Sequence, residues 1–278
     1  MPNREVEITE GGYNPGEINT LGYWPKWETQ ACDMPLTLDI MPIGSLNPED
    51  LESSKIGIAS FVVMEQGHEF LEAVAAEIAT NIVNGVNPKK ALQMVTVESK
   101  GSFLAPYIKR ALDQLATGRA SERIIVFRKA EPEDGTSEQI NKAPKVYMNR
   151  PVLIAGKEVW PPPVLTYNSI TTAEDQGIVL GPRDIEYIEK LDSSRVEMVI
   201  VDDFLGTGGS AEAMVDLLEA RLLWVQERFY LAVAGSDGDL WKEKLQAPGS
   251  RIHVLDPLPL VLPTFVRSDE NQPWKIMS

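Results

Sequence analysis

Apolar residues recur along most of the chain in two alternating patterns, short β-branched runs and longer stretches with helical spacing. From Lys55 onward, the runs that we interpret as strands are 56–63, 92–97, 124–127, 178–180, 196–201, 229–233 and 252–255. Between them, apolar residues three or four positions apart predict helices over 66–83, 103–115, 182–191, from Ser210 and near Leu240. This alternation predicts an α/β fold with a central, mostly parallel sheet flanked by helices.

Two stretches depart from this alternation. Residues 1–50 carry Pro15, Pro25, Pro35, Pro42 and Pro48 among several aromatic residues. Because proline interrupts helices and sheet ladders, we expect an N-terminal arm or small irregular extension there. Residues 131–165 are too long for an ordinary connection and predict an insertion, either a flexible loop or hairpin strands near 152–154 and 164–167. The main domain then spans 51–265, followed by a C-terminal tail over 266–278.

Composition and charge narrow the classes of function. The chain has 278 residues, 43% of them hydrophobic, and its 26 Lys+Arg against 41 Asp+Glu give a net charge of −15. This charge argues against binding to nucleic acid or to an anionic membrane, which clustered Lys and Arg would hold. With Cys32 as the one cysteine, no internal disulfide or multi-cysteine zinc site can form. Without an apolar run near the ~20 residues of a membrane span, or a signal-peptide pattern at the start, we expect a soluble, cytoplasmic protein.

The segment Val199–Ala211 carries the clearest chemistry. An apolar strand ends in Asp202 and Asp203, and a small-residue loop then opens a helix. Backbone N–H groups at a helix start can converge on a phosphate. The residues that we assign to this phosphate site are Gly206, Thr207, Gly208, Gly209 and Ser210. Paired carboxylates beside it indicate recognition of hydroxyl groups or of a metal on the same ligand, although Asp203 could instead be a structural cap of the loop.

This loop lacks the lysine and spacing of a Walker A sequence and the spacing of a dinucleotide-binding Gly-x-Gly-x-x-Gly. It resembles the phosphoribosyl pyrophosphate signature of the type I phosphoribosyltransferases. In that family two acidic residues and two apolar residues precede a Thr/Ser-Gly-Gly-Thr/Ser loop, and Asp202 to Ser210 match that pattern throughout.

Two further segments lie where this resemblance needs them. Residues 95–105 look like the turn that holds pyrophosphate in adenine and xanthine phosphoribosyltransferases, which implies a pyrophosphate role for Glu98, Ser99, Lys100 and Gly101. Arg128 and Lys129 are similar to the cationic pair at the end of another family strand, sometimes placed across a dimer interface. Taken alone, the first segment could be a plain strand-to-helix turn and the second a solvated strand end.

The resemblance also implies an architecture and a reaction. It implies the type I phosphoribosyltransferase fold, with a hood of other segments over the base, a homodimer and a cytoplasmic location. The reaction would transfer the 5-phosphoribosyl group to a nucleobase and release pyrophosphate. Asp202 and Asp203 would hold the ribose hydroxyls as catalytic residues. Mg²⁺ would bind through the pyrophosphate and reach this Asp pair through water, with no direct protein ligand.

The acceptor base is less constrained. Phe204 and Leu205 could offer an apolar face to the plane of a base, or one or both could enter the core. Where the adenine enzymes commonly have Glu, the sequence has Thr171 or Thr172, which favours a 6-oxopurine such as xanthine over adenine. Two alternatives stay open: a regulator that binds phosphoribosyl pyrophosphate without turnover, and an enzyme with a non-purine acceptor.

Overall fold

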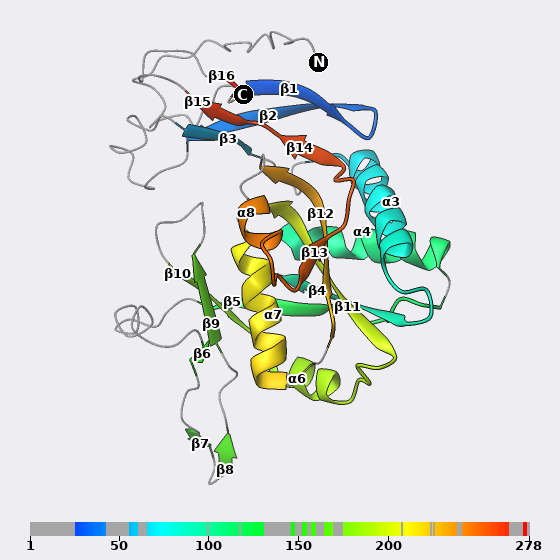
Figure 1. Ribbon diagram of the computed structural model, residues 1–278, viewed down its shortest axis with the longest axis vertical. Helices are drawn as coiled ribbons and strands as arrows, with labels where there is room; N and C mark the ends of the chain where they lie inside the picture. The colour runs from blue at the N-terminus through cyan, green and yellow to red at the C-terminus, as the bar shows by residue number, and fades with distance from the viewer. Residues whose placement is uncertain are drawn as a thin grey trace.

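The computed structural model of this chain has two sheets and the helices that pack on them (Figure 1). It describes residues 26–42, 56–60, 66–98, 100–116, 118–130, 146–147, 152–154, 157–159, 164–168, 175–206, 208–222, 224, 226–237, 241–266 and 275–276. Among these residues, no helix has the length and apolar character that crossing a membrane requires.

The larger sheet has nine strands and a mostly parallel centre. In spatial order they are β13 (Ile252–Val254), β12 (Phe229–Asp237), β11 (Val196–Leu205), β4 (Ala91–Val97), β5 (Ile125–Ala130), β10 (Asp175–Val179), β9 (Val164–Asn168) and β6 (Val146–Tyr147), while β14 (Leu260–Leu262) pairs with β12. Pairing is parallel from β13 to β5 and antiparallel from β5 to β6. The central strands β4 and β11 are buried nearly throughout because both of their faces are covered.

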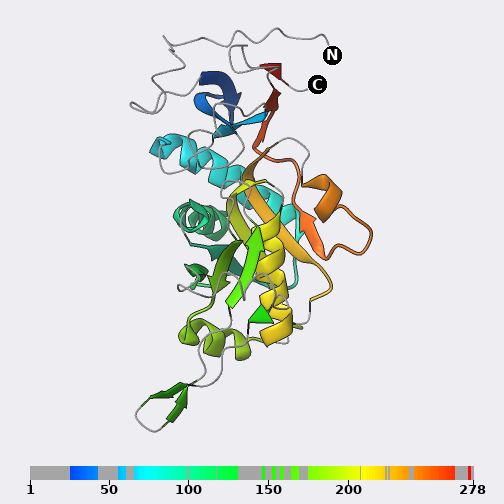
Figure 2. The same ribbon diagram turned by 90° about the vertical axis from the view of Figure 1, so that its left-hand side faces the viewer.

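Helices cover both faces of this sheet (Figures 1 and 2). Their bounds are α3 (His68–Gly85), α4 (Lys100–Leu115), α6 (Pro182–Glu189), α7 (Gly209–Leu222) and the short α8 (Lys242–Leu245). One hydrophobic cluster joins α3 and α4 to one face of β11 through Val199 and Val201. A second cluster joins α6 and α7 to the other face through Met198 and Ile200. The predicted α/β architecture is therefore confirmed.

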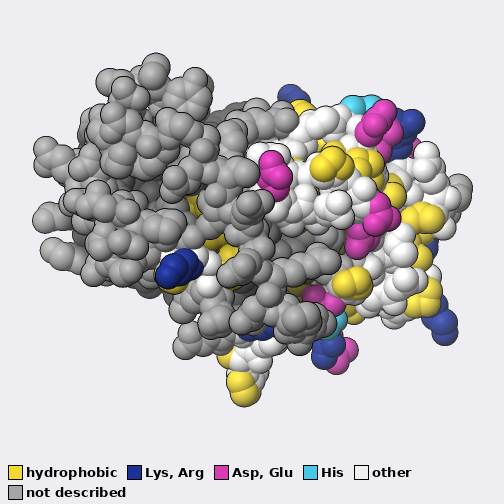
Figure 3. All heavy atoms as spheres, turned by 90° about the horizontal axis from the view of Figure 1, so that it is seen from above, with side chains coloured by type: hydrophobic (Ala, Val, Ile, Leu, Met, Phe, Trp, Pro, Cys, Tyr) yellow, Lys and Arg dark blue, Asp and Glu magenta, His cyan; other side chains and the backbone are white. Residues whose placement is uncertain are grey.

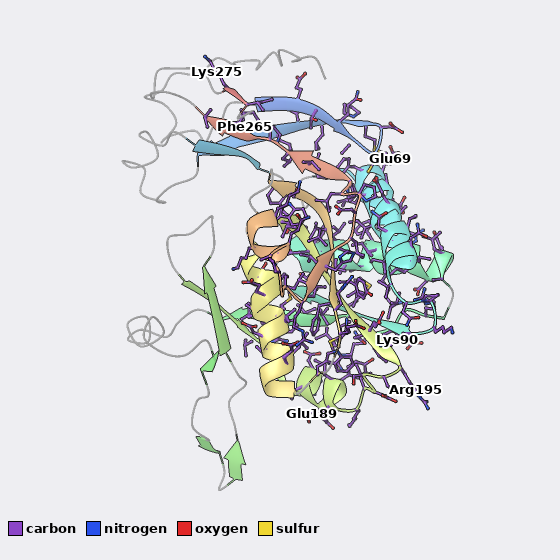
Figure 4. The ribbon with its side chains drawn as sticks, in the orientation of Figure 1. Glu69, Lys90, Glu189, Arg195, Phe265 and Lys275 are labelled. Atoms are coloured by element: carbon purple, nitrogen blue, oxygen red, sulfur yellow. The ribbon has the colours of Figure 1, made fainter. Side chains whose placement is uncertain are left out.

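A second, five-stranded sheet lies beyond the ends to which β11 and β12 point (Figure 1). It consists of β1 (Lys26–Ala31), β2 (Met34–Pro42), β3 (Ile56–Ser60), β15 (Thr264–Val266) and β16 (Lys275–Ile276), all antiparallel. Figure 4 places Phe265 in this sheet and Lys90 and Arg195 at the opposite end, where β4 and β11 begin. Seen from the side of the second sheet, the molecule has acidic and basic side chains next to one another in places (Figure 3).

The second sheet shares its core with the larger one. Leu36, Leu38 and Ile40 of β2 and Phe265 of β15 belong to the same buried cluster as α3 and α4. In the turn between β1 and β2, the Cys32 thiol donates a hydrogen bond of 3.2 Å to Glu77 Oε2 on α3. Burial, followed by this bond and the charges of Glu77 and Asp33, raises the pKa of the Cys32 thiol to about 12.

The strand predicted over 56–63 is present as β3, but it does not belong to the parallel sheet. It pairs antiparallel with β2 and β15. A short β-branched run indicates a strand and not its partners, so the sequence pattern could not separate the two sheets. Strands 152–154 and 164–168 are also present, yet β7 (Val152–Ile154) pairs with β8 (Lys157–Val159), whereas β9 pairs with β10 and β6. Figure 2 shows the β7–β8 hairpin projecting from the domain.

The irregular structure expected over residues 1–50 is wrong for β1 and β2, which form a regular antiparallel pair. Pro35 lies opposite Gln30 of β1, while β2 meets β3 only from Asp39 onward. Among the described residues, Pro35 therefore has a strand neighbour on one side only, as at a sheet edge, where proline is tolerated. The tail expected from residue 266 likewise includes β16, although the domain boundaries themselves stay predictions.

We expect Phe265→Ala to destabilise both sheets together. The Phe265 side chain is 0% exposed and lies in the shared cluster, so its removal should cost about 3–5 kcal/mol of unfolding free energy. Urea unfolding followed by circular dichroism would measure this loss. Val261→Ala, at a side chain that is 60% exposed, is the control and should change stability by less than about 0.5 kcal/mol. Two separate transitions in the wild-type protein would contradict a shared core.

Candidate functional site

The candidate site lies at the carboxyl end of β11. Pairing between β4 and β11 ends at Thr96 and Val201, so Asp202 is the first residue of β11 beyond this pairing. On the other side, β12 continues to pair with β11 as far as Leu205. Asp202 and Asp203 are only 8% and 5% exposed. Two carboxyl groups are thus buried at the edge where open α/β sheets place ligands.

Gly101 at the start of α4 packs directly against Asp202. A Cβ atom at Gly101 would lie 2.8 Å from Asp202 Oδ1, 3.2 Å from Asp202 Cα and 2.7 Å from Thr96 Oγ1. Real Cβ atoms do not approach other atoms so closely, so this approach requires a residue without a side chain. The structure therefore brings together two segments that the sequence analysis assigned to one ligand.

Asp202 also contacts the start of α7. The Ser210 hydroxyl donates a hydrogen bond of 3.3 Å to Asp202 Oδ2, and the Asp203 N–H donates one of 2.9 Å to Asp202 Oδ1. Since α4 begins at Lys100 and α7 at Gly209, the Asp202 carboxyl group lies between two helix N-termini. The N–H groups and partial positive charge of helix N-termini favour anionic ligands.

The loop Gly206–Ser210 connects β11 to α7 through a left-handed residue. Gly208 has φ of 81°, a conformation that favours glycine. Its carbonyl accepts a 3.1 Å hydrogen bond from the Glu212 N–H in the first turn of α7. A Cβ atom at Gly208 would lie 2.7 Å from Leu245 Cδ1, so α8 packs against the loop. Thr207, which we assigned to the phosphate site, lies outside the described residues.

Burial and the Asp203 carboxyl group beside it raise the pKa of Asp202 well above its usual range. The charge of Asp203 and a hydrogen bond between the two side chains act in the same direction, whereas the bonds from the Asp203 N–H and Ser210 oppose them. Two adjacent buried carboxyl groups resist ionising together. A cation or a hydroxyl donor bound beside Asp202 would favour its ionised form.

The turn expected to hold pyrophosphate adjoins the cationic end of β5. The Glu98 N–H donates a 2.6 Å hydrogen bond to the Phe127 carbonyl, next to Arg128. Glu98 and Arg128 are both exposed. Ser99 lies outside the described residues, as do the side chains of Lys100 and Lys129. The backbone thus places both predicted pyrophosphate segments side by side on neighbouring strands.

Phe204 and Leu205 lie in different surroundings. Leu205 is 3% exposed and belongs to the cluster around α7, so its side chain is part of the core. Phe204 is half-buried and packs at the margin of the cluster around α3 and α4. Phe204 is therefore better placed than Leu205 to make the contact with a base that we predicted for both residues. The Thr171 and Thr172 positions lie outside the described residues.

Sequence reasoning missed two residues that shape the site. Thr96 is fully buried in β4 and presents its hydroxyl group to Gly101; a polar residue within an apolar strand was the available signal. Leu245 covers Gly208, and no sequence pattern indicated this contact. Among the described residues, no group of three or more His, Cys, Asp or Glu side chains is arranged to hold a metal ion.

No protein-family model matches the sequence, and no curated protein sequence matches it. Among solved structures, it is similar to the APRTase from Giardia lamblia complexed with 9-deazaadenine, at 17% identity over 90% of this chain and 98% of that one, with a TM-score of 0.41. It is also similar to a hypoxanthine phosphoribosyltransferase from Staphylococcus aureus, at 14% identity over 69% and 84%, with a TM-score of 0.36. A hypothetical protein from Neisseria gonorrhoeae with bound ppGpp has 12% identity over 70% and 84% and a TM-score of 0.38. The function is therefore inferred from the site's own residues.

We expect Asp202→Asn to stabilise the ligand-free protein at neutral pH. Because the pKa of Asp202 is raised by folding, its stabilising contribution is complete below the unfolded pKa of about 3.9 and is lost as the pH rises through the raised folded pKa. The amide is neutral at every pH. The Tm of the variant at pH 7.5 should therefore exceed that of the wild type, by about 3 °C for each kcal/mol recovered, and the difference should shrink toward pH 4.

Asp192→Asn is the matched control with the opposite sign. Hydrogen bonds from the Ser194 side chain and backbone lower the pKa of the exposed Asp192, so its contribution is present above the unfolded pKa and is lost on acidification. This variant should have a slightly lower Tm at pH 7.5. An Asp202→Asn variant that is less stable than wild type at that pH would contradict the raised pKa.

Gly101→Ala should weaken binding of phosphoribosyl pyrophosphate, the ligand expected from the sequence, by at least about tenfold. The added Cβ would displace Asp202 or Thr96, because both lie within 3 Å of its position. Isothermal titration calorimetry would measure the change. Gly67→Ala, where nothing lies within 4 Å, is the control. Equal affinities of the Gly101→Ala and wild-type proteins would place the ligand elsewhere.

Proposed function

We propose that this chain is a magnesium-dependent type I phosphoribosyltransferase that transfers the 5-phosphoribosyl group from phosphoribosyl pyrophosphate to a purine base and releases pyrophosphate. The observation that carries the proposal is the contact of Gly101 with Asp202. It joins the turn after β4 to the Asp pair and the loop before α7. One ligand with a phosphate, vicinal hydroxyl groups and a pyrophosphate would fill these three parts together.

Each part of the ligand would have its own residues. The 5-phosphate would accept hydrogen bonds from backbone N–H groups of Gly206–Ser210 at the start of α7. The ribose hydroxyls would bind Asp202 and Asp203 at the end of β11. The pyrophosphate would lie by Glu98–Gly101 and Arg128–Lys129, whose backbones adjoin through the Glu98 to Phe127 hydrogen bond.

The same carboxylates would lower the barrier to transfer. As the bond from ribose C1 to pyrophosphate breaks, positive charge develops on the sugar. A buried carboxylate beside that charge stabilises it more strongly than water would, because the surroundings screen it less. In the free protein, burial and Asp203 favour the protonated form of Asp202. Ligand binding would therefore have to ionise Asp202 before its charge can act.

The site supplies oxygen ligands of the kind that magnesium prefers, but only from two carboxyl groups. The described residues offer buried carboxylate oxygens at Asp202 and Asp203, and Mg²⁺ binds through one or two carboxylates together with substrate phosphates and several waters. The ion would neutralise charge on the departing pyrophosphate. Asp202 and Asp203 would orient its waters.

We favour a 6-oxopurine such as xanthine as the acceptor. The support is Thr171 or Thr172, at the position where the adenine enzymes commonly have Glu. Phe204, which is half-buried at the end of β11, would contact the plane of the base. The second sheet lies beyond the carboxyl ends of β11 and β12, where a hood would cover that base (Figure 1). The cytoplasmic location and the homodimer stay predictions.

A turnover screen tests this proposal. Purified protein with Mg²⁺ and phosphoribosyl pyrophosphate would be incubated with xanthine, guanine, hypoxanthine, adenine, uracil or orotate, and mononucleotides detected by mass spectrometry. We expect one 6-oxopurine product. Asp202→Asn combined with Asp203→Asn should lower kcat/KM by at least about a hundredfold, because the carboxylates act on charge that develops during transfer.

The screen also separates the alternatives. Glu69→Gln, on the exposed first turn of α3, is the control and should keep wild-type turnover (Figure 4). A uracil or orotate product would indicate a non-purine acceptor. Tight binding of phosphoribosyl pyrophosphate without any product would favour a non-catalytic regulator. An Asp202/Asp203 double variant with full activity would contradict the assigned site.

A further inference from the structure

Trp241 has a buried hydrogen-bond donor without an acceptor. Its side chain is 2% exposed, and among the described residues nothing accepts a hydrogen bond from its indole nitrogen. The indole N–H can only donate, and a buried donor without a partner is unfavourable. Trp224 offers a direct comparison in the same cluster, because its buried indole nitrogen donates a 3.0 Å hydrogen bond to Gln226 Oε1.

Trp241 is held next to the loop Gly206–Ser210 from two directions. The Leu245 N–H donates a 2.8 Å hydrogen bond to the Trp241 carbonyl, and Leu245 packs against Gly208. An ion pair between Lys244 and Glu212 also joins α8 to the first turn of α7. Trp241 and Leu245, four residues apart, thus belong to one helical turn that packs on the loop.

The other constraint comes from β12. Ser236 pairs with Leu205, the residue before the loop, and β12 ends at Asp237. Four residue steps separate Asp237 from Trp241, which limits their separation to about 14 Å even in a fully extended chain. The Trp241 side chain also belongs to the buried cluster that contains Leu205 and Leu245, so Trp241 lies close to the carboxyl end of β11 and to α8.

We propose that Trp241 completes the phosphate site by donating its indole N–H to an oxygen of the phosphate held by Gly206–Ser210. The proposal rests on the proposed function, because it takes the 5-phosphate of the phosphoribosyl group as the acceptor. A phosphate brings several acceptor oxygens to a loop whose own backbone groups are donors. Lys242 Nζ lies 5.8 Å from the centre of the Trp241 ring and adds positive charge beside it.

The test follows the indole N–H directly. The chain has six tryptophans, so ¹⁵N-labelled protein should give six indole signals, and Trp241→Phe and Trp224→Phe identify two of them. Ribose 5-phosphate is then titrated into the wild-type protein. We expect the Trp241 signal to move and its hydrogen exchange to slow, while the Trp224 signal, already hydrogen-bonded to Gln226, stays in place.

Affinity provides the second readout. Trp241→Phe should weaken ribose 5-phosphate binding by about tenfold, the effect of one hydrogen bond to a charged group, whereas Trp224→Phe should leave binding within about twofold of wild type.

Each failure has a different meaning. If ribose 5-phosphate binds while the Trp241 signal stays in place, the donor is satisfied by water only and the inference is wrong, while the phosphate site stands. A signal that moves although Trp241→Phe binds with wild-type affinity would also overturn it, because Trp241 would then only sense the loop. Absence of ribose 5-phosphate binding to the wild-type protein would overturn both the inference and the proposed function.

Discussion

The close approach of Gly101 to Asp202 is the constraint on which the candidate site depends. It fixes the distance between the start of α4 and the end of β11, and it leaves the Asp202 carboxyl group in contact with Ser210 at the start of α7. Two helix N-termini and two buried acidic residues therefore lie close together. An anion is attracted by the helix starts and repelled by the acids, so the arrangement suits a ligand that has separate anionic and hydroxyl-bearing parts.

Much of the larger sheet could be predicted because its central strands are buried on both faces. Strands of that kind are continuous apolar runs, and β4, β5, β11 and β12 all lie close to their predicted positions. The loop after β11 could be predicted because its glycines serve a local backbone geometry, as the left-handed Gly208 shows. Both signals are local, so both can be recognised in the sequence without knowledge of the tertiary structure.

Contacts between residues that are far apart in the sequence could not be predicted. The run that becomes β3 gave no sign that its partners are β2 and β15, and Pro35 obscured β2 itself. The proximity of Gly101 to Asp202 followed only from a family resemblance. Leu245 and Trp241 were missed because covering a glycine, or lacking an acceptor, is a property of the three-dimensional surroundings.

The Cys32 thiol has a practical consequence for work on this protein. With a pKa of about 12, about one molecule in ten thousand carries the reactive thiolate at pH 8. Cys32 is also the one cysteine of the chain. Maleimide reagents should therefore react slowly with the native protein, and a cysteine introduced at an exposed position could be labelled selectively without first replacing Cys32. Distances between such a label and a fluorescent ligand could then be measured in the otherwise unaltered chain.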